Sequence, residues 1–461
     1  MFTLHPYQED MIAGARSALR SHNSILLQSP TGSGKTVLAS TMLGRASDKG
    51  LRAFFICHRA ELIEQTARTF DEVGISYGLI AAGERPDPFQ PVQICSIQTL
   101  ARRYDKVAPP NLVVWDECHH LGAKSWATVH GYYSDAKHVG LTATPERLDG
   151  RGLEAQFSSM VKGPTVAWLI KHGYLADYDL YAPSKPDLTK IHTKMGDYAG
   201  NELATIMDTG TITGDAIKHY QRLTPGKQAV VFAVSIKHSQ HIAEQFKANG
   251  ISAAHIDGTT KRPERKDIIA RFRTGAVRVL CNVDIVGEGF DLPAMQVAIL
   301  LRPTQSTGLY LQQVGRPLRV KPDGSKATIL DHAGNAMRHG LPDEDREWTL
   351  EGHKRKGKKK KQEQSVFIRQ CPVCYYVHKP LPTCPGCGYT YLASENMPDV
   401  KDGELVEVDK EAFKRRQRRE QGGAKTYDEL VALGFARNYK SPHTWARYVI
   451  ASREKKLRRQ A

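Results

Sequence analysis

Residues 29–36 read Ser-Pro-Thr-Gly-Ser-Gly-Lys-Thr, directly after the apolar run Ile25–Leu27 and before a stretch with helical periodicity. Between a strand and a helix, a loop of this kind lets backbone N–H groups surround a phosphate. Lys35 can then reach the β- and γ-phosphates of a nucleotide, and the Thr36 hydroxyl can ligate Mg²⁺. Ser29 stands where the usual pattern has its first glycine. The loop predicts ATP binding by Ser29, Pro30, Thr31, Gly32, Ser33, Gly34, Lys35 and Thr36.

Short apolar, β-branched runs recur on both sides of this loop and alternate with longer amphipathic stretches such as 59–72 and 239–249. The alternation is typical of parallel sheets covered by helices, and it predicts two α/β domains with a boundary near residues 155–170. We assign them to residues 1–160 and 161–345. The expected strands are 25–27, 53–57, 92–96, 112–115 and 139–142 in the first domain, and 229–234, 253–256, 277–283, 297–301 and 327–330 in the second.

Two adjacent carboxylates, Asp116 and Glu117, end the apolar run that begins at Leu112. The carboxyl ends of parallel strands are where ligands bind. Asp116 can hold Mg²⁺ through water, and Glu117 can polarise the water that attacks a γ-phosphate. A capped strand end with solvated acids would explain two carboxylates alone, but not their company with the phosphate loop.

Four of the eight cysteines form two Cys-x-x-Cys pairs separated by nine residues: Cys371, Cys374, Cys384 and Cys387. Four thiolates in this pattern match a closed, tetrahedral, structural Zn²⁺ site. A redox Cys-x-x-Cys is the alternative, although two such pairs with proline and glycine inside them favour metal binding. The four other cysteines are scattered singly, so no disulfide framework is expected. We assign a zinc ribbon to residues 367–392.

The net charge of +16 lies mostly in the last quarter of the chain. Residues 352–461 hold 25 Lys and Arg against 12 Asp and Glu, whereas residues 1–351 hold 40 against 37. A cationic terminal region favours polyanion binding, with a solvated solubility tail as the alternative. We expect a basic linker at 346–366 and a basic helical region at 393–461, which contains a helix near 410–421 and two short helices within 426–456. Together the residues from Gly352 onward are expected to form a separable nucleic-acid grip.

No run of eighteen uncharged apolar residues occurs, and the first residues lack a basic segment followed by an apolar one. Neither a membrane span nor a secretion signal is expected. The expected location is the cytoplasm of a bacterial or phage-infected cell.

Four segments together resemble motifs I, II, III and VI of the superfamily 2 helicases: TGSGKT at 31–36, DECH at 116–119, LTATP at 141–145 and QQVGRPLR at 312–319. The resemblance covers roughly residues 1–340 and implies two RecA-like domains with ATP in the cleft between them. It implies that Gln8, in the segment His5-Pro-Tyr-Gln8, reads adenine, and that Thr142 and Thr144 couple the site to the cleft. The implied catalytic set is Asp116, Glu117, Gln312, Arg316 and Arg319.

Motif VI places Arg316 and Arg319 three residues apart, which would put both on one side of a helical turn. Arginines from the second domain can stabilise charge on the γ-phosphoryl oxygens, so hydrolysis would require closure of the two domains. The resemblance further implies a nucleotide role for Gly287 and Asp291 in motif V. Its implied nucleic-acid contacts are His58, Arg59, Ser96, Gln98, Thr99 and Asn282.

The TATP form of motif III and the Cys-rich ribbon are similar to those of RadD-like DNA helicases and their phage-encoded relatives, which implies DNA as the partner. The alternatives are an RNA helicase of the same fold, or a motor or binding subunit of a restriction- or repair-type complex. In the last case the C-terminal region would contact a protein partner. The oligomeric state is left open.

Overall fold

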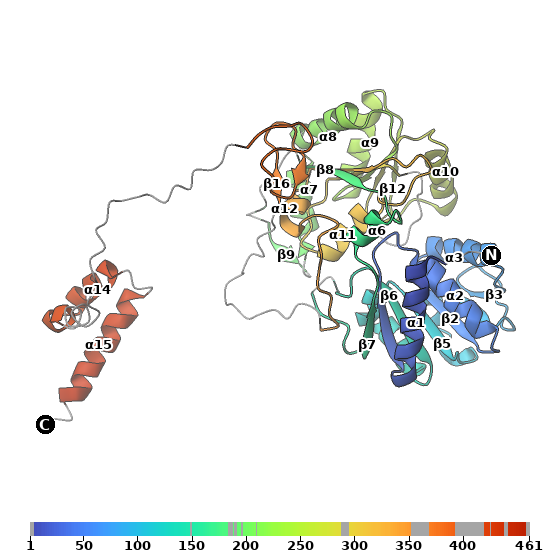
Figure 1. The fold of residues 1–461 in the computed structure, drawn as a ribbon, viewed down its shortest axis with the longest axis horizontal. Helices are drawn as coiled ribbons and strands as arrows, with labels where there is room; N and C mark the ends of the chain where they lie inside the picture. The colour runs from blue at the N-terminus through green and yellow to red at the C-terminus, as the bar shows by residue number, and fades with distance from the viewer. Residues whose placement is uncertain are drawn as a thin grey trace. The chain divides into compact units, whose positions relative to one another are not determined.

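The computed structural model of the chain describes residues 4–147, 150–182, 188, 191–194, 197–208, 210–286, 295–351, 368–391, 419–424, 426–437 and 441–457. These residues form two compact units, of which the first ends at Tyr391 and the second begins at Leu392. The larger unit contains two parallel sheets flanked by helices (Figure 1). The expected α/β architecture is therefore confirmed.

The first sheet has seven parallel strands in the order β3-β4-β2-β5-β6-β1-β7. Its strands and flanking helices alternate along the chain: α1 (Pro6–Ser21), β1 (Ser24–Gln28), α2 (Lys35–Ser47), β2 (Ala53–Cys57), α3 (Ala60–Val73), β3 (Tyr77–Ile80), β4 (Val92–Ser96), α4 (Ile97–Leu100), η1 (Tyr104–Lys106), β5 (Leu112–Asp116), η2 (Cys118–Gly122), α5 (Lys124–Tyr132), β6 (Lys137–Thr142) and β7 (Ser159–Lys162). The central strands are apolar and buried because helices cover both faces of the sheet.

The second sheet has six parallel strands in the order β12-β13-β11-β14-β15-β8. Its elements are α6 (Val166–Lys171), β8 (Tyr178–Tyr181), β9 (Thr193–Lys194), β10 (Asp197–Tyr198), α7 (Gly200–Met207), α8 (Gly210–Leu223), β11 (Ala229–Phe232), α9 (Ile236–Ala248), β12 (Ala253–Ile256), α10 (Arg262–Arg273), β13 (Val279–Asn282), β14 (Val297–Leu300), α11 (Thr307–Gly315), β15 (Ala327–Asp331) and α12 (Asn335–His339). The two shortest strands, β9 and β10, form a separate antiparallel pair.

All ten expected strands are present, and the structure adds β3, β7 and β8 to the sheets. Strand β7 spans the expected boundary at residue 160 and pairs with β1, so the first sheet continues to Lys162. After the second sheet the chain returns to the first domain. There the Leu350 carbonyl accepts hydrogen bonds from the N–H groups of Leu153 (2.7 Å) and Glu154 (3.2 Å).

The cysteine ribbon packs on the second sheet through strands β16 (Arg369–Gln370) and β17 (Val377–His378). Tyr376 forms a β-bridge with Tyr181 at the end of edge strand β8, and the N–H of Ala182 donates to the Tyr375 carbonyl at 3.1 Å. The prediction that everything beyond Gly352 is separable is therefore wrong. An edge strand has unpaired backbone groups, and the ribbon pairs with them.

The second unit, taken by itself, holds α14 (Tyr427–Ala436) and α15 (Pro442–Leu457) as an antiparallel pair around a small core. That core consists of Leu430, Val431, Ala446 and Val449. Both expected short helices are thus present. The expected helix at 410–421 is described only from residue 419 onward, where the chain is helical, and residues 410–418 lie outside the described residues. Among the described helices none is long and apolar enough to cross a membrane.

Candidate active site between the two sheets

The phosphate loop joins β1 to α2, and it has the backbone that its glycines permit. Gly34 has a φ of +79°, which favours glycine, and an added Cβ there would lie 2.6 Å from Nε2 of Gln8, so the Gln8 side chain would have to shift. Helix α2 begins at Lys35, which directs its N-terminal N–H groups at the loop. The Lys35 amine donates to the carbonyls of Ser29 (3.2 Å) and Pro30 (3.4 Å). The loop is therefore preformed around its own lysine.

Tyr7 and Gln8, at the start of α1, both bind the backbone of the phosphate loop. The Tyr7 hydroxyl donates to the Ser33 carbonyl at 2.9 Å, and the Gln8 amide donates to the same carbonyl at 3.3 Å. The side-chain oxygen of Gln8 accepts from the His5 N–H at 3.0 Å. Gln8 is thus buried next to the loop, where its amide can sense a bound nucleotide.

Asp116 and Glu117 lie at the carboxyl end of β5 and are both buried. Burial raises the pKa of Asp116 above its ordinary value, and the negative charge of Glu117 raises it further, while Lys35 lowers it. Glu117 has a φ of +46°, a left-handed conformation that is strained for a residue with a side chain. Strain of this kind is typical of positions where a side chain is aimed at a reacting group.

The charges of both domains meet at Lys35. Burial lowers the pKa of Lys35, and the carboxylates of Glu117 and Asp116 raise it. The positive charges of Arg316 and Arg319, which belong to the second domain, also lower it. The side chain of Arg319 lies at the phosphate loop, since an added Cβ on Gly32 would be 3.7 Å from its Cγ. Charged groups of both domains therefore share one site.

Motif III connects this site to the second domain. His119 Nδ1 lies 3.5 Å from a Glu117 carboxylate oxygen and 3.3 Å from the Thr142 hydroxyl. That hydroxyl donates to the Thr144 carbonyl at 2.9 Å, and Thr144 lies next to Gly308 in the first turn of α11. Thr142 and Thr144 therefore lie on a continuous path from the acidic pair to α11.

Arg316 and Arg319 lie on a turn that follows α11. The expected helical turn is not formed, because α11 ends at Gly315 and Pro317 lacks the N–H that a helix requires. Gly315 touches the phosphate loop so closely that an added Cβ would lie 2.7 Å from Cβ of Thr31. Burial lowers the pKa of Arg319 to about 10, and Gln312, on α11, is also buried.

Most of the expected nucleic-acid residues gather at the carboxyl ends of β2 and β4. The Gln98 amide donates to the His58 carbonyl at 2.9 Å, and the Ser96 hydroxyl donates to the side-chain oxygen of Gln98 at 2.7 Å. Thr99 is the next residue on α4. Arg59 reaches across to the second domain and donates to the Asp284 carbonyl at 2.7 Å. Arg59 thus links this group of residues to the loop after β13 in the second domain.

Asn282 is placed differently, because its side chain is buried and engaged within the fold. Its amide nitrogen donates to the Val231 carbonyl at 2.8 Å, and its amide oxygen accepts from the Val286 N–H at 3.1 Å. These bonds shape the loop after β13. Gly287 and Asp291 lie outside the described residues.

Sequence reasoning did not identify a charged seam between α3 and α10. Glu61 pairs with Arg265, and Glu64 pairs with Arg262 and, at 3.2 Å, with Lys266. Complementary charges at spacings of three and four residues on two helices are a visible signal. Nothing in a single sequence, however, indicates that these two helices meet.

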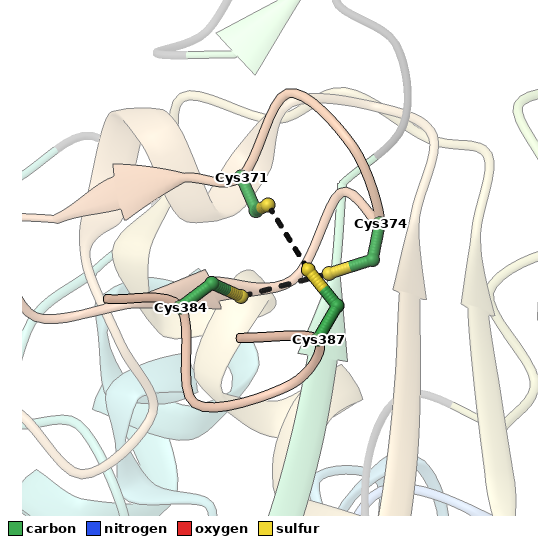
Figure 2. Close-up of side chains that lie close together, drawn as sticks. All are labelled: Cys371, Cys374, Cys384 and Cys387. Atoms are coloured by element: carbon green, nitrogen blue, oxygen red, sulfur yellow. Dashed lines mark hydrogen bonds between the residues drawn. The ribbon is translucent and has the colours of Figure 1, made fainter. Parts of the chain in front are cut away.

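The four ribbon cysteines converge on one point (Figure 2). Their sulfurs all lie within 4.8 Å of one another, with 3.7 Å between Cys371 and Cys387 and 3.6 Å between Cys374 and Cys384. A tetrahedral zinc with bonds of about 2.3 Å would place its sulfurs roughly 3.8 Å apart. Tyr375 and Gly388, the residues that follow each pair, both have positive φ, as two equivalent metal-binding turns require. The cluster fits zinc better than it fits a redox pair, because the nearest sulfurs belong to different Cys-x-x-Cys segments.

Comparisons with known proteins agree with this geometry. Residues 1–147 match the family model "Type III restriction enzyme, res subunit", and residues 214–321 match "Helicase conserved C-terminal domain". A "51.5 kDa protein" of a Lactococcus phage is 35% identical over 394 residues, which cover 84% of this chain and 83% of that protein. The "DNA 3'-5' translocase XPB2" of Sulfurisphaera tokodaii is 24% identical over 358 residues, 69% of this chain and 79% of that protein.

Other relatives, from yeasts, an archaeon and an archaeal virus, are matched over about half to two thirds of their own length. Among solved structures, the "ATP-dependent Type ISP restriction-modification enzyme LlaBIII bound to DNA" superposes with a TM-score of 0.56 at 16% identity. It covers 72% of this chain and 28% of that chain. This likeness confirms the arrangement of two helicase-type sheets.

Proposed function

Since the chain belongs to the superfamily 2 helicases, a family of ATP-hydrolysing enzymes, we propose that it is a DNA-directed motor whose ATP site lies between its two sheets. The observation that carries the proposal is that α11 and the turn after it lie against the phosphate loop. An added Cβ on Gly315 would be 2.7 Å from Cβ of Thr31, and one on Gly32 would be 3.7 Å from Cγ of Arg319. A site assembled from both domains works only when the domains are closed, which links hydrolysis to movement.

The residues present fit a nucleotide with its metal ion. The preformed loop and the N-terminus of α2 suit the β- and γ-phosphates, and the Thr36 hydroxyl and the Asp116 carboxylate would hold Mg²⁺. A bound Mg²⁺ would neutralise phosphate charge. Lys35 would then exchange its bonds to the loop carbonyls for bonds to phosphate oxygens, and Gln8 would read the adenine.

Glu117 is the proposed catalytic carboxylate. It is buried and held in a strained backbone, and His119 lies beside it. It would orient and polarise the attacking water, while Arg316 and Arg319 stabilise the charge that spreads over the γ-phosphoryl oxygens. Gln312 would support these arginines from the end of α11. Closure through Thr144 and α11 would bring the two halves together.

The nucleic acid would lie across the ends of β2, β4 and β13, where His58, Arg59, Ser96, Gln98 and Thr99 gather. Asn282 would act indirectly, through the loop that it shapes. The similarity to a protein named as a DNA translocase and the match to a restriction-enzyme family model support DNA as the partner. A zinc ion held by the four ribbon cysteines would have no open coordination position, so it would stiffen the ribbon at the edge of the second sheet and take no part in catalysis.

The experiment is ATP hydrolysis measured with single-stranded DNA, duplex DNA, forked DNA, RNA and no polymer. DNA should stimulate the rate at least tenfold more than RNA. Equal or greater stimulation by RNA would assign the chain to RNA instead. If none of the polymers raises the rate of ATP hydrolysis, the chain would be a subunit that needs a protein partner.

A further inference from the structure

The turn that carries Arg316 and Arg319 has little regular hydrogen bonding of its own. Helix α11 ends before it, and Pro317 interrupts the pattern. The Arg316 N–H donates to the Gln313 carbonyl at 3.4 Å, which is a long bond. Yet both arginines must be held accurately, because a displacement of about 1 Å in a catalytic group can reduce a rate about 10²-fold. Something outside the turn must therefore fix its backbone.

Two groups bind the carbonyls of this turn. The N–H of Ala176, in the segment that leads from α6 to β8, donates to the Leu318 carbonyl at 2.7 Å. The amine of Lys321 donates to the Pro317 carbonyl at 2.7 Å and to the Arg319 carbonyl at 3.5 Å. The Pro317 and Leu318 carbonyls are thus each held by a short bond from a donor outside the turn, and the Arg319 carbonyl accepts a longer one from the same lysine.

Lys321 is unusual because its side chain is only 5% exposed, whereas lysines are rarely buried. Burial lowers the pKa of Lys321 to about 8, so the amine is still protonated at neutral pH and can donate to both carbonyls. Its neighbour Val320 is 54% exposed. The chain therefore turns a lysine inward and a valine outward, the reverse of what solvation alone favours.

We propose that Lys321 is a positioning residue for ATP hydrolysis, which fixes the backbone of the turn so that Arg319 reaches the γ-phosphoryl group. The inference rests on the proposed role of Arg319. The Lys321 amine does not need to touch the nucleotide, because it binds the carbonyls of Pro317 and Arg319, on both sides of Leu318. Without these bonds, the turn could shift while the sheet and α11 stay in place.

The test compares Lys321→Met, which keeps the length of the side chain but removes the donor, with the native chain. The stimulated kcat should fall about 10- to 100-fold, while the KM for ATP changes less than about threefold. Lys326→Met is the matched control, since Lys326 is 55% exposed and pairs with Asp177 at 2.7 Å on the surface. The control should keep its native kcat. Thermal unfolding reports whether each variant is folded, and Lys321→Leu, which also lacks a donor, replaces Lys321→Met in the same comparison if the latter does not fold.

The decisive step repeats the substitution in an Arg319→Ala background, with single-turnover rates. If Lys321 acts through Arg319, the second substitution should cause less than about a twofold further loss. Equal losses in both backgrounds would overturn the proposal, because Lys321 would then act on something other than Arg319. A native kcat for Lys321→Met would overturn it as well. If Arg319→Ala itself hydrolyses ATP at the native rate, the proposed function of Arg319 is what fails.

Discussion

At the scale of single residues, buried histidines make the stability of the folded chain depend on pH. Burial lowers the pKa of His138 and His238 to about 4 and that of His332 to about 3, and for His332 the charge of His219 adds to the effect. Neither ring nitrogen of His332 has a hydrogen-bond partner among the described residues. These imidazoles are neutral in the folded chain, whereas in the unfolded chain they take up protons below about pH 6.5.

Since the unfolded chain binds more protons than the folded chain between about pH 6.5 and pH 4, the free energy of unfolding should fall as the pH falls through this window. Each group can contribute at most about 1.4 kcal/mol per pKa unit, so over roughly 2.5 pH units the upper limit for the three groups together is about 10 kcal/mol. Thermal unfolding at pH 7.5, 6.5, 5.5 and 4.5 measures it.

His332→Phe keeps the ring but removes the titrating group, so its melting temperature should fall less steeply with acid than that of the native chain. An identical pH profile for the two proteins would mean that His332 does not contribute.

At the scale of elements, the cysteine ribbon is joined to the second sheet by backbone pairing. Tyr376 also packs against Tyr181 with ring centroids 5.3 Å apart, and its hydroxyl donates to Asp179 at 3.2 Å. Metal binding by the ribbon and the pairing of the ribbon with β8 should therefore depend on each other.

We expect Cys374→Ser to reduce bound zinc from about one ion per chain to nearly none, and to lower the melting temperature by several degrees. Four-ligand sites lose most of their affinity when one thiolate is removed, and the ribbon cannot keep its pairing with β8 once it unfolds. Metal analysis and thermal unfolding give the two values. Val373→Ser, at an exposed position of the same segment, should keep its zinc. If Cys374→Ser loses zinc with no change in melting temperature, the docked ribbon does not stabilise the second sheet.

The sequence predicts the elements with strong local patterns and misses those that depend on distant contacts. Nine of the ten expected strands are rich in apolar residues and buried over nearly their whole length, and the phosphate loop and the acidic pair follow from residues adjacent in the chain. Strand β8, in contrast, is only partly buried, and its place is fixed by pairing with β15. The docking of the ribbon, the α3–α10 seam and the inward Lys321 likewise arise from long-range packing. The spacing of Arg316 and Arg319 can be read from the sequence. The two residues lie on a turn and not on a helix, because α11 ends at Gly315 and Pro317 cannot continue it.

At the scale of the whole molecule, the boundary between the two compact units lies between Tyr391 and Leu392. Truncation after Tyr391 removes 16 Lys and Arg and 11 Asp and Glu, and leaves the docked ribbon and the Leu350 contact in place. Basal ATP hydrolysis should stay within about twofold of the native value.

Nucleic-acid affinity should fall and its salt dependence should flatten, because fewer cations contact phosphates and a tethered second module is lost. Binding to labelled DNA at 50 and 200 mM salt, compared with the full chain, measures both effects. Unchanged affinity and salt slope would indicate that this region docks a protein instead.

The central claim is that ATP is hydrolysed in the site between the two sheets, with Glu117 as the catalytic carboxylate. The most direct test measures nucleotide affinity and DNA-stimulated ATP hydrolysis of Glu117→Gln, with Glu154→Gln at an exposed position as the control. The amide has the shape of the carboxylate but cannot polarise water as strongly, so affinity should stay within a few-fold while the rate falls about 10²- to 10⁴-fold. A near-native rate for Glu117→Gln in the presence of DNA would contradict the account.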